Sequence, residues 1–333
     1  MSTRAAAGRV TPGRTDFLIE HAQVLSIAAF FAFCCALFAA LSAVFLLPGN
    51  LLNLVRQEAP MLIVATAMTF VITTGGIDLS VGSVVALTNA LAAIALRAGW
   101  PWPAAVLAIL LLGAGIGTAQ GWFIAYQRIP AFIVTLAGLS MLRGTALLLT
   151  QGYSIPIAPH GVFLDIGRGW LLGVPVPAVL AALAALLGFV VLARTRYGRQ
   201  VVAVGANAEA ARRVGMPAQR VTASVYALSG AASALAGLVI AARLGSGSSN
   251  AAVGFELEAI AAVVLGGTSL FGGTGTVIGT VLGAMTIAVI GNGLILVHTS
   301  PFLTQIVTGA IILLAIWLNT RVFARLTASR RRS

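Results

Sequence analysis

Residues 24–47 read VLSIAAFFAFCCALFAALSAVFLL and contain no charged side chain. A helix needs about 20 mostly apolar residues to cross a hydrocarbon layer roughly 30 Å thick, and this run meets that length. It is also longer than the roughly 7–15 apolar residues at the centre of a secretory signal peptide. The run therefore predicts a first transmembrane helix that the protein retains.

The rest of the chain has the same apolar character. Of its 333 residues, 59% are hydrophobic and only 8% are charged, and the mean hydropathy is +1.02. Soluble domains are about a quarter charged, so this composition predicts an all-α, polytopic transmembrane helical bundle. We expect about ten spans, at residues 24–47, 59–74, 79–96, 103–125, 130–151, 170–193, 222–242, 257–271, 276–297 and 302–319.

The net charge of +12 comes from 20 arginines, because the chain contains no lysine. A Walker A phosphate-binding loop requires a lysine, so this chain cannot be a P-loop ATPase on its own. If ATP drives the protein, a partner subunit must bind the ATP and its magnesium, and we expect no cofactor in this chain. No metal-ligand spacing and no catalytic constellation points to a metal site or an enzyme.

The arginines also predict how the chain is oriented in the membrane, since basic residues favour the cytoplasmic side. With ten spans and a cytoplasmic N-terminus, 15 of the 20 arginines fall on the cytoplasmic side, four fall outside and Arg143 lies within a span. This asymmetry accounts for the positive charge without nucleic acid. We expect cytoplasmic tails at residues 1–23 and 321–333 and a transmembrane domain at 24–320.

One predicted cytoplasmic loop, residues 194–221, holds six arginines and one glutamate between apolar runs. Within it, Asn207 is a good N-cap, and Glu209 falls in the first turn, where the helix dipole favours negative charge. Arg212 lies in the last turn, and Gly215 suits a left-handed helix end. The pattern predicts a short capped helix. It is either a solvated loop or a docking element for a soluble partner.

Several long motifs resemble the permease subunits of ribose-type ABC sugar importers, within the branched-chain amino acid/ribose permease family. They include TTGGIDLSVGSVVAL at 73–87, RTRYGRQVVAVGANAEAARRVGM at 194–216 and ELEAIAAVVLGGTSLFGGTGTVIGTVLGA at 256–284. The resemblance runs in order through most of the chain from about residue 55 to 318. It implies alternating-access import of a monosaccharide such as ribose, xylose or galactose, or of a related small polar solute.

The same resemblance implies partners and a location. It implies a cytoplasmic ABC ATPase subunit, an external sugar-binding protein, a second permease copy and a bacterial-type cytoplasmic (inner) membrane. In this family the loop between the sixth and seventh spans contacts the ATPase, and that loop matches residues 194–221. The residues expected to couple to the ATPase are Arg199, Gly205, Asn207, Glu209, Ala210, Ala211, Arg212 and Gly215.

Glycine-broken short spans often line the path of a transporter, so we expect segments 59–82 and 257–275 to do so. The candidate path residues are Asp78, Ser80, Arg143, Glu256, Glu258, Thr268, Ser269 and Asn292. Structural alternatives stay open for several of them. Asp78 could be an N-cap, the two glutamates could favour a helix start, Arg143 could form an ion pair and Asn292 could hydrogen-bond between helices.

Two further expectations concern packing and a rival function. Glycines at every fourth position, 113–121 and 275–283, predict close contact between helix backbones. The rival function is an ion-coupled secondary transporter of a small polar solute. It would require carboxylates within the membrane, and Asp78 and the glutamates lie at predicted helix ends instead.

Overall fold

The computed structural model describes residues 22–158 and 161–300, together with single positions at 303, 306, 307, 309, 310 and 313. Most of this part is helical. The α-helices are α2 (Ala22–Leu41), α3 (Pro48–Thr73), α4 (Val81–Arg97), α5 (Trp102–Ala125), α6 (Ala131–Thr150), α7 (Asp165–Arg168), α8 (Val176–Arg194), α9 (Arg196–Ala206), α10 (Ala208–Arg213), α11 (Ala218–Leu244), α12 (Phe255–Leu265) and α13 (Val277–Leu296).

Seven helices in the described part are long and apolar enough to cross a membrane: α2, α3, α5, α6, α8, α11 and α13. Helix α4 is apolar but has only 17 residues. The protein is therefore an all-α, multi-pass membrane bundle. The predicted tails and nearly all of the predicted tenth span, 302–319, lie outside the described residues.

Four predicted spans have bounds that differ from the helices by at least six residues at one end. The first ends at Leu41 instead of residue 47, and the sixth begins at Val176 instead of residue 170. The second begins at Pro48 instead of residue 59 and runs for 26 residues, with Pro60 inside the helix. The eighth was predicted over 257–271, but α12 has 11 residues and ends at Leu265. At 1.5 Å per residue it is about 16 Å long, which reaches only halfway across the hydrocarbon layer.

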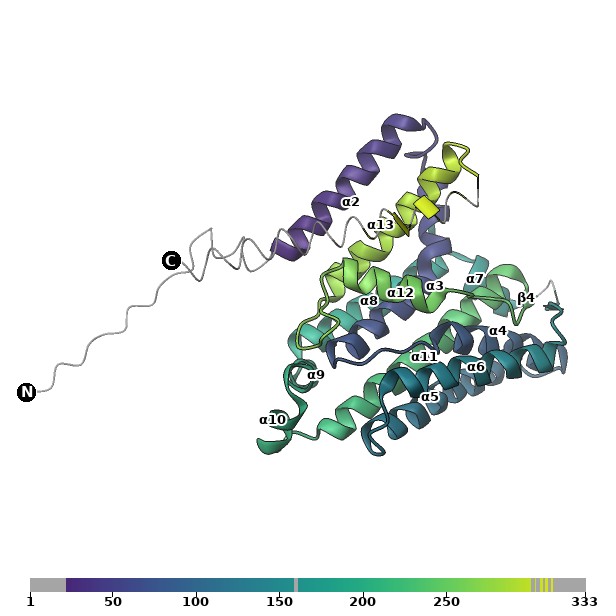
Figure 1. Ribbon diagram of the computed structural model, residues 1–333. Coiled ribbons are helices and arrows are strands. Elements are labelled where there is room, and N and C mark those ends of the chain that lie inside the picture. The colour runs from purple at the N-terminus through teal and green to yellow at the C-terminus, as the bar shows by residue number, and fades with distance from the viewer. Residues whose placement is uncertain are drawn as a thin grey trace, which may run out of the picture.

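Helices α3 and α11 form the centre of the bundle. Most residues in the hydrophobic stretches of α3 and α11 are buried. Helices α2, α5, α6 and α8 instead expose apolar faces on the periphery. Figure 1 shows α11 running through the molecule, with α5 and α6 on one flank and α2 and α13 on the other. An apolar face that is exposed on a membrane helix is suited to contact with lipid.

The glycine stripes bring helix backbones together, as predicted. A β-carbon on Gly113, Gly117 or Gly121 of α5 would collide with the backbone of α11. On α13, a β-carbon on Gly279 would overlap the carbonyl oxygen of Gly266, just after α12. The absence of a side chain at these glycines therefore allows the helix backbones to lie unusually close together.

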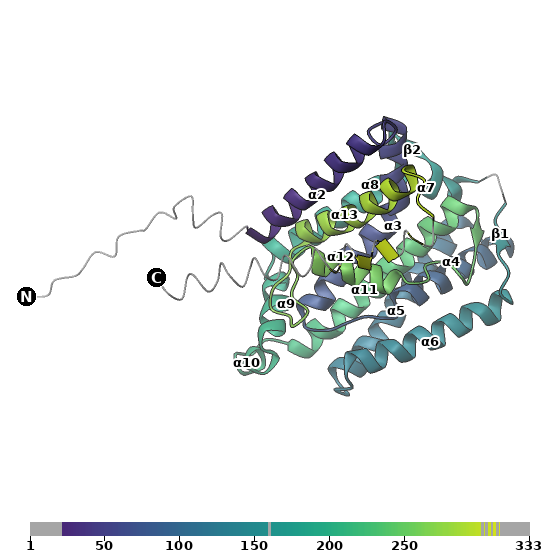
Figure 2. The same ribbon diagram turned by 45° about the horizontal axis from the view of Figure 1, so that its top comes forward.

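Short irregular elements connect the helices at the two ends. Strand β1 (Ile155–Pro156) pairs antiparallel with β4 (Ser246–Gly247), and β2 (Trp170–Leu171) pairs with β3 (Val174–Pro175). A 3-10 turn, η1 (Val162–Leu164), precedes α7. These elements lie at one end of the bundle, and α9 and α10 lie at the other (Figures 1 and 2).

Candidate functional site

The charged loop folds into two short helices at one end of the bundle. Helix α9, which the sequence pattern did not predict, is capped by Thr195, whose side chain accepts a hydrogen bond from the Gly198 amide. Helix α10 begins after Asn207, whose side chain accepts a 2.9 Å hydrogen bond from the Ala210 amide. Gly215 has φ +82°, so the predicted cap and left-handed end are both confirmed.

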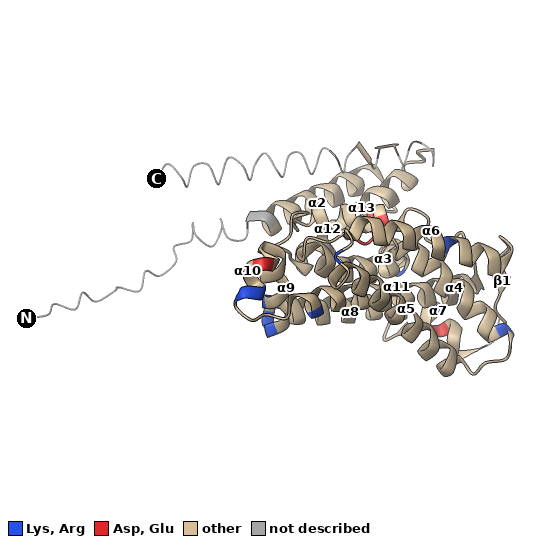
Figure 3. Ribbon diagram, turned by 60° about the horizontal axis from the view of Figure 1, so that its bottom comes forward, with Lys and Arg blue, Asp and Glu red and all other residues tan. Residues whose placement is uncertain are grey.

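The charges on α10 face solvent. The Glu209 carboxylate lies 3.5 Å from a guanidinium nitrogen of Arg212 and 3.5 Å from one of Arg213, and its side chain is 62% exposed. Among the other coupling candidates, Ala210 is exposed, whereas Ala211 is buried against the bundle. Figure 3 shows the acidic and basic residues together at α10. The helix thus presents one charged surface outward and one apolar side inward.

The C-terminal end of α9 packs against both helix breaks of the bundle. Gly205 approaches the backbone so closely that a β-carbon would overlap the Thr73 carbonyl oxygen at the end of α3. The Gly273 amide donates a 2.9 Å hydrogen bond to the same carbonyl. Gly75 and Gly272 also meet here, both with positive φ. We call these four glycines and Thr73 the glycine junction.

The glycine junction joins three segments that lie far apart in the sequence. It joins the break between α3 and α4, the end of α9 and the loop between α12 and α13. Each close approach requires a glycine because any side chain would occupy the position of neighbouring backbone atoms. The end of α9 is therefore in direct backbone contact with both breaks.

Asp78 is almost fully buried between α4, α5 and α11. Its Oδ1 accepts 2.9 Å and 2.7 Å hydrogen bonds from the amide and hydroxyl of Ser80, and its Oδ2 accepts a 2.7 Å bond from Ser229. Ser80 Oγ also lies 3.0 Å from Gln120 Oε1. Ser80, directly before α4, makes no cap hydrogen bond with its own side chain, whereas Asp78 accepts from the amide two residues on, as an N-cap does. The capping alternative for Asp78 is thus confirmed, and the same carboxylate also ties the break after α3 to α11.

Arg143 and Glu256 come together at the opposite end of the bundle from α10. The Arg143 guanidinium donates to the carbonyls of Ser249 and Ala251 at 2.6 Å and 2.9 Å, and to that of Ala252 at 3.4 Å. The Ala252 carbonyl and Glu256 Oε2 both lie over Gly82 of α4. The partners of Arg143 are thus backbone carbonyls of the segment between α11 and α12. No residue pattern could have identified them.

The other path candidates lie in separate places. Thr268 and Ser269 follow α12, and Glu256 and Glu258 both lie in its first turn, which confirms the helix-start alternative, with Glu258 exposed. Asn292 exchanges 3.0 Å and 3.1 Å hydrogen bonds with Asn50 of α3, which confirms the interhelical alternative. The eight candidates therefore do not form one cluster.

Several buried polar residues were not among the site candidates that the sequence suggested. Ser229 and Gln120 hold Asp78 and Ser80, and Thr69 Oγ1 lies 2.7 Å from Thr280 Oγ1 between α3 and α13. The Tyr226 hydroxyl is buried near Gly76, with no hydrogen-bond partner among the described residues. Isolated polar residues inside apolar runs were the available signal.

Together, the membrane bundle, its capped charged loop and the helix breaks packed against that loop define a polytopic transport permease. The chain belongs to the family described as branched-chain amino acid transport system / permease component, which matches residues 50–316. It is therefore a transporter component and not an enzyme.

Characterised relatives are similar over most of their length. The ribose import permease protein of Bacillus subtilis (strain 168) is 42% identical over 83% of this chain and 86% of its own. The ribose import permease protein of Escherichia coli (strain K12) is 38% identical over 96% of this chain and 99% of its own. The xylose transport system permease protein of the same strain is 35% identical over 85% of this chain and 86% of its own. No solved structure matched the chain.

Proposed function

We propose that this chain is the membrane permease of an ATP-driven importer for a monosaccharide or a related small polar solute. Its similarity to ribose and xylose permeases supports sugar as the class of cargo. The observation that carries the mechanism is the glycine junction, where the end of α9 contacts the breaks after α3 and α12. Movement of a docked partner on α10 would reach both breaks through rigid backbone contacts.

The proposed topology has ten spans and two cytoplasmic termini. Nine of the spans are α2, α3, α4, α5, α6, α8, α11, α12 and α13, with α12 crossing only partly, and the tenth is residues 302–319. The excess of arginine on one side supports this orientation. It leaves residues 1–23 and 321–333 as tails in the cytoplasm and makes 194–221 a cytoplasmic coupling loop of the 24–320 domain.

In this proposal, an ABC ATPase subunit docks on residues 194–221 and binds ATP and magnesium, so the permease itself needs no cofactor. The exposed charges of α9 and α10 support a protein contact. Arg199 of α9 and Glu209 and Arg212 of α10 would lie on the docking surface. An external sugar-binding protein delivers the cargo, and a second permease copy completes the path. The chain lies in a bacterial-type inner membrane and has no role in binding nucleic acid.

The path is proposed to run beside the irregular segments that flank α12. Half-length helices and interrupted backbone mark binding sites in many transporters. Ser80, Thr268 and Ser269 lie at such interruptions, and Arg143 and Glu256 hold the segment before α12 near α4. These residues would open or close the transport path as α9 moves. Asp78 and Asn292 support the path by holding helices together.

Transport in proteoliposomes tests the proposal. The purified permease, its partner ATPase and a sugar-binding protein should give sugar uptake that depends on internal ATP and stops without the ATPase. Uptake driven by a proton or sodium gradient alone would instead establish the ion-coupled alternative.

Labelling tests the orientation separately. A single Ala208→Cys substitution in a Cys34→Ala, Cys35→Ala background should react with a membrane-impermeant maleimide only from the cytoplasmic side. Reaction only from the external side would contradict the coupling role of the loop.

A further inference from the structure

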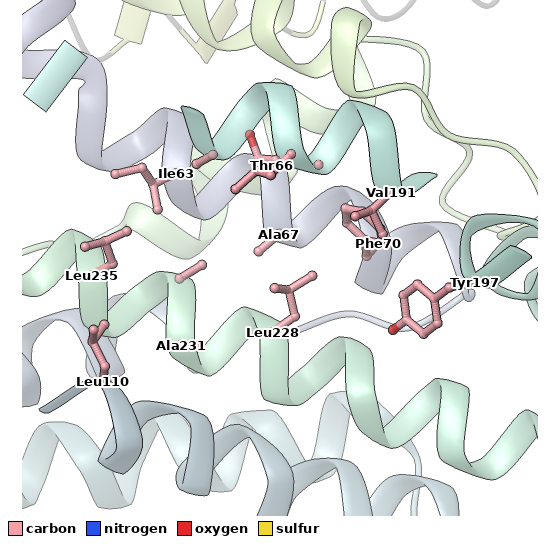
Figure 4. Close-up of a pocket in the computed structure, with 14 residues that line it drawn as sticks. Ile63, Thr66, Ala67, Phe70, Leu110, Val191, Tyr197, Leu228, Ala231 and Leu235 are labelled. Carbon is pink, nitrogen blue, oxygen red and sulfur yellow. The ribbon is translucent and has the colours of Figure 1, made fainter. Parts of the chain in front are cut away.

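A cavity of about 500 Å³ opens between five helices of the bundle. It is lined by Ile63, Thr66, Ala67 and Phe70 of α3, Leu110 of α5, Ala184, Leu187, Gly188 and Val191 of α8, Tyr197 of α9, and Leu228, Ala231, Ala232 and Leu235 of α11. We call it the α8–α11 groove. Figure 4 shows side chains of α3 and α11 facing each other across it, with Tyr197 at one end.

The groove offers no free polar group to a ligand. The Thr66 hydroxyl donates a 2.7 Å hydrogen bond to the Leu62 carbonyl within its own helix. The Tyr197 hydroxyl lies 2.7 Å from the Ser224 hydroxyl, and burial raises the pKa of the phenol above its ordinary value. Every other lining side chain is hydrocarbon. An occupant of the groove must therefore be apolar.

The dimensions of the groove fit one leaflet of a membrane. The lining residues of α11 run from Leu228 to Leu235, and seven rises of 1.5 Å give a length of about 10 Å. Half of the hydrocarbon layer is about 15 Å thick. The groove is open toward the outside of the bundle, where Leu187 is 64% exposed. Its length and exposure therefore suit a single acyl chain that enters from the surrounding lipid.

Two exposed arginines, Arg194 and Arg220, flank the end of the groove that Tyr197 lines. Arg194 follows Val191 by three residues on α8, and Arg220 precedes Ser224 by four and Leu228 by eight on α11. Residues at these spacings share a helix face, so both arginines extend the lining toward the membrane surface. Both are exposed and form no ion pair with the described residues.

We propose that the α8–α11 groove binds one acyl chain of an anionic phospholipid, whose phosphate is held by Arg194 and Arg220. The long arginine side chains reach the headgroup region while their stems lie along the apolar wall. Basic pockets between transmembrane helices recognise anionic headgroups in this way. The site would tie the ends of α8 and α11, which bracket the charged loop, to the acidic lipid of one leaflet.

The test measures lipids that are retained by the purified chain in detergent, using native mass spectrometry with equal amounts of phosphatidylglycerol and phosphatidylcholine. The wild-type chain should retain phosphatidylglycerol preferentially. Ala184→Phe would fill the groove and should abolish this retention. Ala182→Phe is the matched control, because residue 182 lies on the exposed side of the same helix, outside the lining. It should behave as the wild type.

A second pair of variants tests the headgroup contact without altering the groove. Each arginine near an anionic surface contributes roughly a fivefold preference, so Arg194→Gln with Arg220→Gln should lower the preference for phosphatidylglycerol about 25-fold. Arg128→Gln removes an exposed charge between α5 and α6 and should change little.

Three results would overturn the proposal. They are equal retention of both lipids by the wild type, unchanged retention by Ala184→Phe, and an altered oligomeric state of that variant with its lipid still bound. The last result would make the groove a contact between copies of the chain.

Discussion

The hydroxyl of Ser229 donates a 2.7 Å hydrogen bond to the carboxylate of Asp78, which precedes it by 151 positions in the chain. This bond connects the break between α3 and α4 to the central helix α11. Buried carboxylates are tolerated only where hydrogen bonds replace water, and Ser80 supplies the remaining donors. The bond therefore fixes the start of α4 against the centre of the bundle.

Asp78→Ala should lower the free energy of unfolding by about 1–3 kcal/mol, because the hydroxyls of Ser80 and Ser229 would lose their acceptor. Ser229→Ala should cost less, since Asp78 would keep both bonds from Ser80. Thermal unfolding of the two single variants and the double variant in detergent gives the coupling between the sites. Strictly additive effects would mean that the Asp78–Ser229 bond contributes nothing to stability.

Gly205→Ala should uncouple the charged loop from the bundle, because the new β-carbon would overlap the Thr73 carbonyl oxygen. We expect the variant to insert and to co-purify with the partner ATPase, yet to lose most ATP-driven uptake. Gly144→Ala on α6 is the control, since no atom lies within 4 Å of the corresponding β-carbon. Wild-type uptake by Gly205→Ala would show that the glycine junction does not transmit motion.

Glu209→Arg should weaken docking of the ATPase without affecting the fold of the permease. The carboxylate is largely exposed and its two ion pairs lie on the surface, so their loss should change stability by less than about 1 kcal/mol. Reversal of the charge at a partner surface is far more costly. Co-purification with the ATPase measures the effect, and Glu209→Gln should give an intermediate loss. An unchanged yield of the complex would show that α10 is not part of the docking surface.

Gly279→Leu should separate α13 from the end of α12 and destabilise the protein, because even a β-carbon overlaps the Gly266 carbonyl oxygen. Overpacking of this kind typically costs about 1–3 kcal/mol. Gly291→Leu on the same helix has no atom within 4 Å of its β-carbon and should be tolerated. The melting temperatures of the two variants in detergent provide the comparison. Equal values would argue against close packing at Gly279.

Hydropathy predicted most of the helices but misplaced several of their ends, and two of these errors have a clear physical reason. Arg56, Gln57 and Glu58 interrupt the apolar run before residue 59, although the helix continues through them from Pro48. Residues 257–271 form a nearly continuous apolar run, yet the helix stops at Leu265, before the Gly266–Gly267 pair. Hydropathy measures the cost of transfer into lipid and does not detect where a backbone turns within protein.

The caps of α10 were predictable because a capping interaction is local. Asn207 and the amide that it accepts from are only three residues apart. The contacts of Asp78, Arg143 and Gly205 were not predictable, because each one joins segments that only the folded bundle brings together. The sequence therefore predicted the kind of residue at each site better than it predicted the partner.

The short length of α12 restricts which side of the molecule can border lipid. Non-helical backbone runs before it, at residues 245–254, and after it, at 266–276. Inside a membrane, peptide groups without helical partners are tolerated only beside protein or water. The flank that carries α12 must therefore be shielded from hydrocarbon, whereas the α8 side is free to border it. This asymmetry gives the chain one side that borders lipid and another that is turned away from it.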